Sequence, residues 1–348
     1  MTQFDIQNYQ PSDSLYLWWL GRPATPVFVG ELRMARQTKG VSLVYGDAWL
    51  RSGFALSEDL PLVKREFFPL EKETAAGAVD DARPDRWGER VIRLLDKPAR
   101  LSVLDFLFYA GDERFGALGV SVSPDEYLAR HMGALPQLSD AREIEQLVRQ
   151  ILAGEPIDER KRHLIAPGAT LGGASPKALV NLDGQPWVLK FNESGEPIDM
   201  PLVEHATMTL SEQAGIRVAR SMPVKVLKGH AVAVQRFDRA AGLHRQHMAE
   251  LFRRMVFNIL IDNTDDHEKN HVLLMTDSGE YALSPAFDVL PSGQALGYQQ
   301  MRVGAQGADA TLTNAMSECA QFGLKRPEAT DQVQKVFAVV SNWQEHYI

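Results

Sequence analysis

The chain has 348 residues, of which 45% are hydrophobic and 24% charged, so its composition is that of an ordinary globular protein. Domains hold roughly 100–200 residues, and the length therefore predicts two domains or one large two-lobed one. A net charge of −8 disfavours non-specific nucleic-acid binding, because neutralisation of phosphates supplies most of that affinity. We expect any contact with DNA to be indirect. The single cysteine, Cys319, excludes an intramolecular disulfide and a cysteine-based zinc site.

The N-terminal segment gives no targeting signal. It is polar and lacks the basic start and apolar core of a secretory signal. No apolar run approaches the ~20 residues that a helix needs to span a bilayer. These features predict a cytoplasmic protein with no membrane partner.

The first part of the chain, residues 1–135, is predicted to form a β-rich domain. A helix is expected to open at Asp85, and another over Val103–Tyr109. Three runs of β-forming residues precede them, separated by glycine-containing turns: Leu15–Leu20, Val27–Met34 and Val41–Trp49.

Residues 136–348 are predicted to form a second domain, with a small lobe to about residue 240 and a helical large lobe after it. A helix is expected near Ile144–Leu152, with Asp140 as its cap. The pair Asp183-Gly184 joins two β-type runs and indicates a hairpin. Apolar residues at helical spacing over Met248–Ile259 predict a long helix. A mixed lobe followed by a helical lobe favours a ligand-binding cleft.

The densest polar group is the octet Asn263–Asn270. Asp265 and Asn270 have the spacing of the kinase catalytic loop, in which the Asp orients the attacking hydroxyl and the Asn supplies an oxygen to Mg²⁺. A solvated loop with a capping Asp explains the octet equally well. Asp266 is the alternative candidate for the catalytic aspartate. We prefer Asp265 because it keeps the sequence spacing to Asn270 that the kinase catalytic loop has. For His267 we favour a structural role in fixing its neighbours.

Asp288 is the one acidic residue in the apolar, turn-forming stretch Ser284–Leu290, which follows an expected hairpin over Val272–Leu283. Mg²⁺ takes oxygen ligands, usually one or two carboxylates together with substrate phosphates. Asp288 is therefore a candidate second metal ligand beside Asn270. An aspartate that only accepts hydrogen bonds from turn amides is the competing interpretation.

A third feature is the glycine-rich segment that contains Gly172 and Gly173. Glycines let backbone N–H groups approach phosphate oxygens, although a plain turn explains this segment alone. Lys190 lies in the β-type run Trp187–Phe191, where it could pair with phosphates or merely protect an edge strand. Glu204, on the next helix, could hold Lys190 in place. The order of these features along the chain, more than any one of them, favours phosphoryl transfer.

With these motifs the chain resembles the HipA family of serine/threonine kinases over nearly its whole length. The resemblance implies an α/β (α+β) fold, in which a protein-kinase-like two-lobed core follows an N-terminal β-rich accessory domain. In the core it lies in Gly172–Ala178, Val234–Arg239, Thr264–Asn270 and Ser284–Leu290, and in the accessory domain in Pro84–Gly88 and Gly111–Leu118.

The resemblance also implies a role for each site residue. Asp265 would be the catalytic base, and Asn270 and Asp288 would be the Mg²⁺ ligands. The residues implied in ATP binding are the phosphate-binding Lys190, the loop residues Thr170, Gly172 and Gly173, the adenine-hinge residues Gln235 and Phe237, and His267.

Family resemblance further implies regulation and partners. Family members are commonly silenced by autophosphorylation in the glycine-rich loop, which here gives Thr170 and Ser175 as candidates. Relatives are neutralised by a small helix-turn-helix antitoxin that also binds DNA. The expected protein is an ATP- and Mg²⁺-dependent toxin kinase with a protein substrate, such an antitoxin, and DNA contact only through it.

Two alternatives remain at this point. A catalytically weak nucleotide-binding regulator, acting with a DNA-binding antitoxin, would conserve the fold but not the activity; the intact Asp265, Asn270, Asp288 and Lys190 argue against it. A metal-dependent hydrolase built on the acidic and histidine side chains near Asp265 is disfavoured, since adjacent residues seldom converge on one ion.

Overall fold

The computed structural model describes the chain in eight segments: residues 9–22, 24–114, 116–128, 133–165, 175–193, 197–237, 247–275 and 281–347. The chain groups into two compact units, Met1–Ser194 and Gly195–Ile348, which we describe separately. The division predicted between residues 135 and 136 rests on a change of pattern along the sequence and not on contacts between residues, so the two divisions differ. It stays a prediction.

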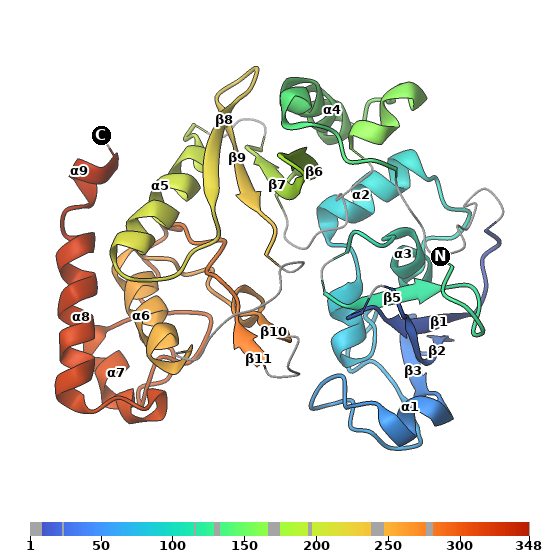
Figure 1. The fold of residues 1–348 in the computed structure, drawn as a ribbon, viewed down its shortest axis with the longest axis horizontal. Coiled ribbons are helices and arrows are strands. Elements are labelled where there is room, and N and C mark those ends of the chain that lie inside the picture. The colour runs from blue at the N-terminus through green and yellow to red at the C-terminus, as the bar shows by residue number, and fades with distance from the viewer. Residues whose placement is uncertain are drawn as a thin grey trace. The chain divides into compact units, whose positions relative to one another are not determined.

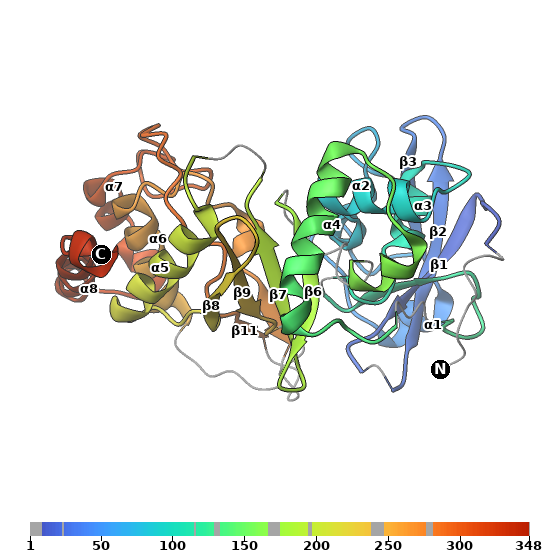
Figure 2. The same cartoon turned by 90° about the horizontal axis from the view of Figure 1, so that it is seen from above.

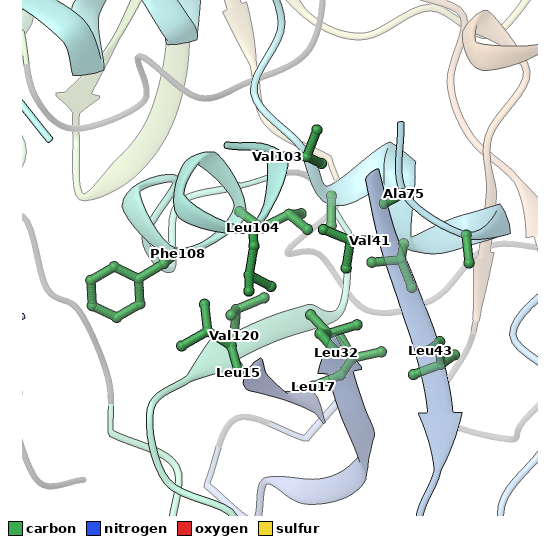
Figure 3. Close-up of a cluster of buried hydrophobic side chains, with 14 of the residues drawn as sticks. Leu15, Leu17, Leu32, Val41, Leu43, Ala75, Val103, Leu104, Phe108 and Val120 are labelled. Carbon is green, nitrogen blue, oxygen red and sulfur yellow. The ribbon is translucent and has the colours of Figure 1, made fainter. Parts of the chain in front are cut away.

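The first unit contains an antiparallel sheet with the strand order β4-β3-β2-β1-β5. Buried apolar residues of β1, β2 and β3 supply an apolar layer. Figure 3 shows side chains of this layer, such as Leu15 and Leu32, lying against Leu104 and Phe108 of helix α3. The strands are β1 (Ser14–Trp19), β2 (Val27–Ala35), β3 (Gly40–Tyr45), β4 (Glu66–Phe67) and β5 (Leu118–Ser121).

The third predicted strand is too long. β3 ends at Tyr45, and helix α1 (Asp47–Ser52) follows at once. Gly46 stands at the break, with Asp47 in the first helical turn, where a negative charge is favourable. Trp49 is therefore a buried helix residue, whose Nε1 donates a 3.0 Å hydrogen bond to the carbonyl oxygen of Phe54.

Two of the helices of the first unit begin at a residue whose side chain caps them. Asp85 caps α2 (Arg86–Leu95) by accepting hydrogen bonds from the amides of Trp87 and Gly88, at 3.0 and 3.1 Å. α3 (Val103–Tyr109) has the predicted bounds, and α4 (Ala141–Ala153) packs near α2 (Figure 2). Asp140 precedes α4 but accepts from the Gln137 amide at 2.8 Å, so its side chain does not cap that helix as expected. The 3₁₀ segments described in this part are η2 (Gly77–Ala82), η3 (Leu138–Asp140) and η4 (Glu159–Leu164).

The predicted hairpin around Asp183-Gly184 is present. β6 (Lys177–Leu182) and β7 (Gln185–Phe191) are antiparallel, with Lys177 opposite Lys190. Both turn residues have positive φ, 52° at Asp183 and 77° at Gly184, which is the backbone geometry that two-residue hairpins require.

The second unit carries a hairpin, a long helix and a C-terminal group of helices (Figure 1). Phe252 and Val256 of α6 are fully buried and pack in one core with Ala329 and Val336 of α8. Its elements are α5 (Met200–Gln213), β8 (Ser221–Lys225), β9 (His230–Gln235), α6 (His247–Leu260), η5 (Glu268–Asn270), β10 (Leu273–Met275), β11 (Tyr281–Leu283), α7 (Leu312–Ser317), η6 (Cys319–Phe322), α8 (Arg326–Val340) and α9 (Trp343–Tyr347). Within the described segments, the helices all fall short of the length and apolarity that a bilayer crossing requires.

Candidate active site

The polar octet forms a loop that folds back on the end of α6. Asp262 has a φ of 58°, and this left-handed residue turns the chain after the helix. The backbone amide of Asn263 then donates to the carbonyl oxygen of Asn258 at 2.9 Å, and Nδ2 of Asn263 donates to Oδ1 of Asn258 at 3.3 Å. The loop therefore begins at a fixed point on α6.

The two adjacent aspartates of this loop have different environments. Asp265 is exposed, whereas Asp266 is only 6% exposed. Nε2 of His271 lies 2.9 and 3.0 Å from the two carboxylate oxygens of Asp266, so this carboxylate is occupied by an internal contact. Asp265 is the one that solvent and a substrate hydroxyl can reach. The choice of Asp265 as the base stays a prediction.

Asn270 ends the loop in the 3₁₀ turn η5. Its amide donates to the carbonyl oxygen of His267 at 2.9 Å, and the residue is 7% exposed. His267 itself is half-buried, and its Nδ1 has no hydrogen-bond partner within the described segments. The loop thus presents Asn270 from a short, internally bonded turn.

The segment with Asp288 is fixed by backbone contacts. Ala286 donates to the carbonyl oxygen of Arg217 at 2.7 Å and accepts from the amide of Ala219 at 2.9 Å. Next to it, the rings of Phe287 and Phe237 lie 5.1 Å apart between centroids. Asp288 follows with a φ of 58°, a left-handed conformation that few residue types adopt without strain. The backbone contacts of Ala286 and the ring contact of Phe287 therefore fix the chain directly before this left-handed residue.

The chain after Asp288 returns to the octet. The hydroxyl of Ser292 donates to the carbonyl oxygen of Asp262 at 2.7 Å and lies 2.6 Å from the hydroxyl of Thr264. The carboxylate of Asp262 accepts from the amide of Ala295 at 2.8 Å. The loop that carries Asp265 and Asn270 is thus joined directly to the chain that follows Asp288.

A buried charge network lies beneath both segments. Nη2 of Arg254, on α6, donates to the carboxylate of Glu250 and, at 2.6 Å, to the carbonyl oxygen of Ser284. Burial lowers the pKa of the Arg254 guanidinium, and the Glu250 and Asp266 carboxylates oppose that change. Sequence reasoning missed this network. The signal was present, because two opposite charges four residues apart interrupt the apolar face of a helix.

The other predicted residues fall in both units. Lys190 is half-buried on β7 of the first unit, and Glu204 is 5% exposed on α5 of the second. Gln235 ends β9, and its amide donates to the carbonyl oxygen of Arg220 at 2.8 Å. Ser175 is exposed just before β6. Thr170, Gly172 and Gly173 lie outside the described residues. That Lys190 converges with Asp265, Asn270 and Asp288 stays a prediction.

The available donors suit a hard cation beside phosphates. Asn270 and Asp288 offer an amide and a carboxylate oxygen, the ligand chemistry that Mg²⁺ takes together with substrate phosphates. A dedicated protein cage is a different arrangement. Across the described segments, no group of three or more His, Cys, Asp and Glu side chains is arranged to hold a metal ion.

Comparison with known proteins gives a consistent picture. The model of the HipA-like C-terminal domain matches residues 169–251 and 241–343, and the model of the HipA N-terminal domain matches residues 24–121. The Sinorhizobium fredii protein Y4dM, named as a candidate kinase, is 29% identical over a match that covers 31% of this chain and 37% of that protein. The match thus spans little more than a third of that relative.

Among solved structures, the chain is similar to one described as the Shewanella oneidensis MR-1 toxin–antitoxin system HipA, HipB and its operator DNA. The TM-score is 0.59 at 17% identity, and the match covers 95% of this chain and 91% of that one. The likeness confirms the mixed α/β fold class expected from the sequence.

Proposed function

The chain belongs to the HipA family, and from this premise we propose that it is an ATP- and Mg²⁺-dependent serine/threonine protein kinase, the toxin of a toxin–antitoxin pair. One observation carries the proposal. Asp266 is buried against His271, and this leaves Asp265 exposed on the loop that also presents Asn270. A kinase needs a catalytic-loop carboxylate that the substrate hydroxyl can reach.

Each residue then has a defined task. Asp265 orients the substrate hydroxyl and accepts its proton, while Asn270 and Asp288 offer oxygens to Mg²⁺. Lys190 binds phosphate oxygens, and Gln235 to Phe237 hold the adenine. Mg²⁺-ATP would supply the transferred phosphoryl group and much of the charge neutralisation. The remaining task of the chain is positioning, because loose phosphoryl transfer asks for little covalent help.

Regulation and partners are part of the proposal. We propose self-inactivation by autophosphorylation in the glycine-rich loop, at Thr170 or Ser175. The exposure of Ser175 makes it accessible to such a modification. The partners would be a protein substrate and a small helix-turn-helix antitoxin, with DNA reached only through the antitoxin, in the cytoplasm.

The test is the intact mass of the protein after expression and after incubation with Mg²⁺-ATP, compared between wild type and Asp265→Asn. We expect added phosphate on the wild type and none on the variant. Glu268→Gln is the matched control, because Glu268 is an exposed carboxylate of the same loop with no assigned role. This control should match the wild type.

Two results would contradict the proposal, one at the residue and one at the activity. Phosphate on Asp265→Asn would remove Asp265 from the chemistry. A wild type that gains thermal stability with Mg²⁺-ATP but never transfers phosphate would instead identify the nucleotide-binding regulator.

A further inference from the structure

We infer that Arg254 is a positioning residue, which holds the segment of Asp288 and the loop of Asp265 and Asn270 in one fixed relation. The inference rests on the proposed function and adds to it a residue that neither the motifs nor the family likeness assign. Its basis is a single buried guanidinium that is hydrogen-bonded to the first segment and lines a small cavity together with residues of the second.

The contacts of Arg254 with the metal-binding segment are direct. Its side chain comes from the third turn of α6 and is 3% exposed. Nη2 donates at 2.6 Å to the carbonyl oxygen of Ser284, four residues before Asp288. The Glu250 carboxylate accepts from the same nitrogen and fixes the guanidinium from the preceding helical turn.

On the other side Arg254 faces the catalytic loop. Arg254, Asp266, Asn270, His271 and Phe287 line a common cavity of about 10 Å³, room for no more than about one water. The Asp266 carboxylate attracts the guanidinium across this space. Because the space is so small, a shift of one lining residue must displace the others.

The energetics argue against a purely structural reason for this arginine. Nε and Nη1 of Arg254 have no hydrogen-bond partner in the part of the chain that the structure describes. A buried cation with incomplete hydrogen bonding is costly, and apolar side chains often replace buried ion pairs without loss of stability. A buried arginine at this position therefore lowers stability, and a role in positioning the site explains why it is there.

Three variants test the inference. Arg254→Met removes the charge and the hydrogen bonds but keeps a long side chain, and Arg254→Lys keeps the charge with a single donor group. The matched control is Arg253→Met, since Arg253 is the neighbouring arginine of α6 and its Nη1 donates to Gln332 at 3.2 Å, away from the site. For each, kcat, the KM for ATP and the Mg²⁺ concentration for half-maximal phosphotransfer are measured.

We expect Arg254→Met to lower kcat about 10- to 100-fold, as small displacements of catalytic groups do. The Mg²⁺ requirement should rise, while the KM for ATP at saturating Mg²⁺ changes less than about threefold. Arg254→Lys should lie between Arg254→Met and wild type, and Arg253→Met should equal wild type. A merely structural residue would lower the melting temperature without this separation of kcat from KM.

The outcomes separate the two proposals. A wild type without phosphotransfer overturns the proposed function and this inference with it, whereas an active wild type matched by Arg254→Met overturns the inference alone. If Arg254→Met does not fold, Glu250→Gln and Arg254→Lys decide the matter, because each loosens the guanidinium and keeps most of its packing. Full kcat and unchanged Mg²⁺ dependence in both would overturn the inference.

Discussion

The indole Nε1 of Trp87 donates a 2.8 Å hydrogen bond to the backbone carbonyl oxygen of Lys177, 90 residues further along the chain. The contact joins the first turn of α2 to the first residue of β6, the strand that follows the glycine-rich segment. Both partners are buried, and Nζ of Lys177 lies 3.6 Å from the carboxylate of Asp85, which caps the same helix. Two motifs far apart in the sequence therefore meet at one point of the first unit.

Trp87→Phe should destabilise the protein, because it keeps most of the ring packing and leaves the carbonyl oxygen of Lys177 without its donor. We expect a loss of about 1–3 kcal/mol in the free energy of unfolding, the usual cost of an unsatisfied buried group. Denaturant unfolding measures it. Trp343→Phe, at a half-exposed tryptophan of α9, is the control and should change the free energy by much less.

The pH dependence of stability should contain a contribution from Asp85. Burial raises the pKa of this carboxyl, and the ammonium of Lys177 only partly opposes that effect. A raised folded-state pKa means that the stabilisation is complete below the unfolded value, about 3.9, and is lost as the pH rises through the folded-state value. Asp85→Asn keeps an N-cap acceptor but cannot titrate.

Urea unfolding of Asp85→Asn and wild type over a pH series from about 3.5 to 7 gives the measurement. We expect the variant to gain stability relative to the wild type as the pH rises. A difference between the two proteins that stays constant over this range would contradict the assignment.

His271→Ala should weaken catalysis, although His271 has no proposed contact with the substrate. It removes the partner of the buried Asp266 carboxylate, and the loop that carries Asp265 loses an anchor. We expect a loss of about 1–3 kcal/mol in the free energy of unfolding, and a kcat at least about tenfold lower. Phosphotransfer and denaturant unfolding are measured on the same preparations, with the exposed His163→Ala as the unaffected control.

Asp288→Asn should separate metal binding from folding. Asn tolerates the left-handed backbone at this position, so the melting temperature without nucleotide should be unchanged. The added stability from Mg²⁺-ATP should fall sharply, because a neutral amide replaces the metal-binding carboxylate. Thermal unfolding with and without EDTA gives both quantities.

The matched control for this variant is Asp183→Asn, at a second left-handed aspartate, with a φ of 52° in the β6–β7 turn. It should keep the full response to Mg²⁺-ATP. A response of Asp288→Asn as large as that of Asp183→Asn would remove Asp288 from the metal site.

Local signals in the sequence predicted much of the fold. The pair Asp183-Gly184 specified its hairpin, because few residue pairs adopt positive φ twice in succession. The strand that was expected to continue to Trp49 ends at Tyr45, since an apolar run alone does not distinguish a strand from a buried helix turn.

The sequence predicted the candidate site residues better than the contacts that hold them in place. The spacing of Asp265 and Asn270 indicated the loop, but the contact between Asp266 and His271 depends on the turn that η5 forms between them. The pair Glu250 and Arg254 was visible in the sequence, but the contact of Arg254 with Ser284 was not, because a backbone carbonyl oxygen leaves no mark on the choice of side chain.

The paired rings of Phe237 and Phe287 have a thermodynamic consequence. The ring of Phe237 belongs to the proposed adenine hinge, and the ring of Phe287 directly precedes Asp288. If a base bound at the hinge shifts the first ring, the second must respond, and linkage makes that effect equal in both directions. Nucleotides that differ only in the base should then differ in their apparent affinity for Mg²⁺, although the base never touches the ion.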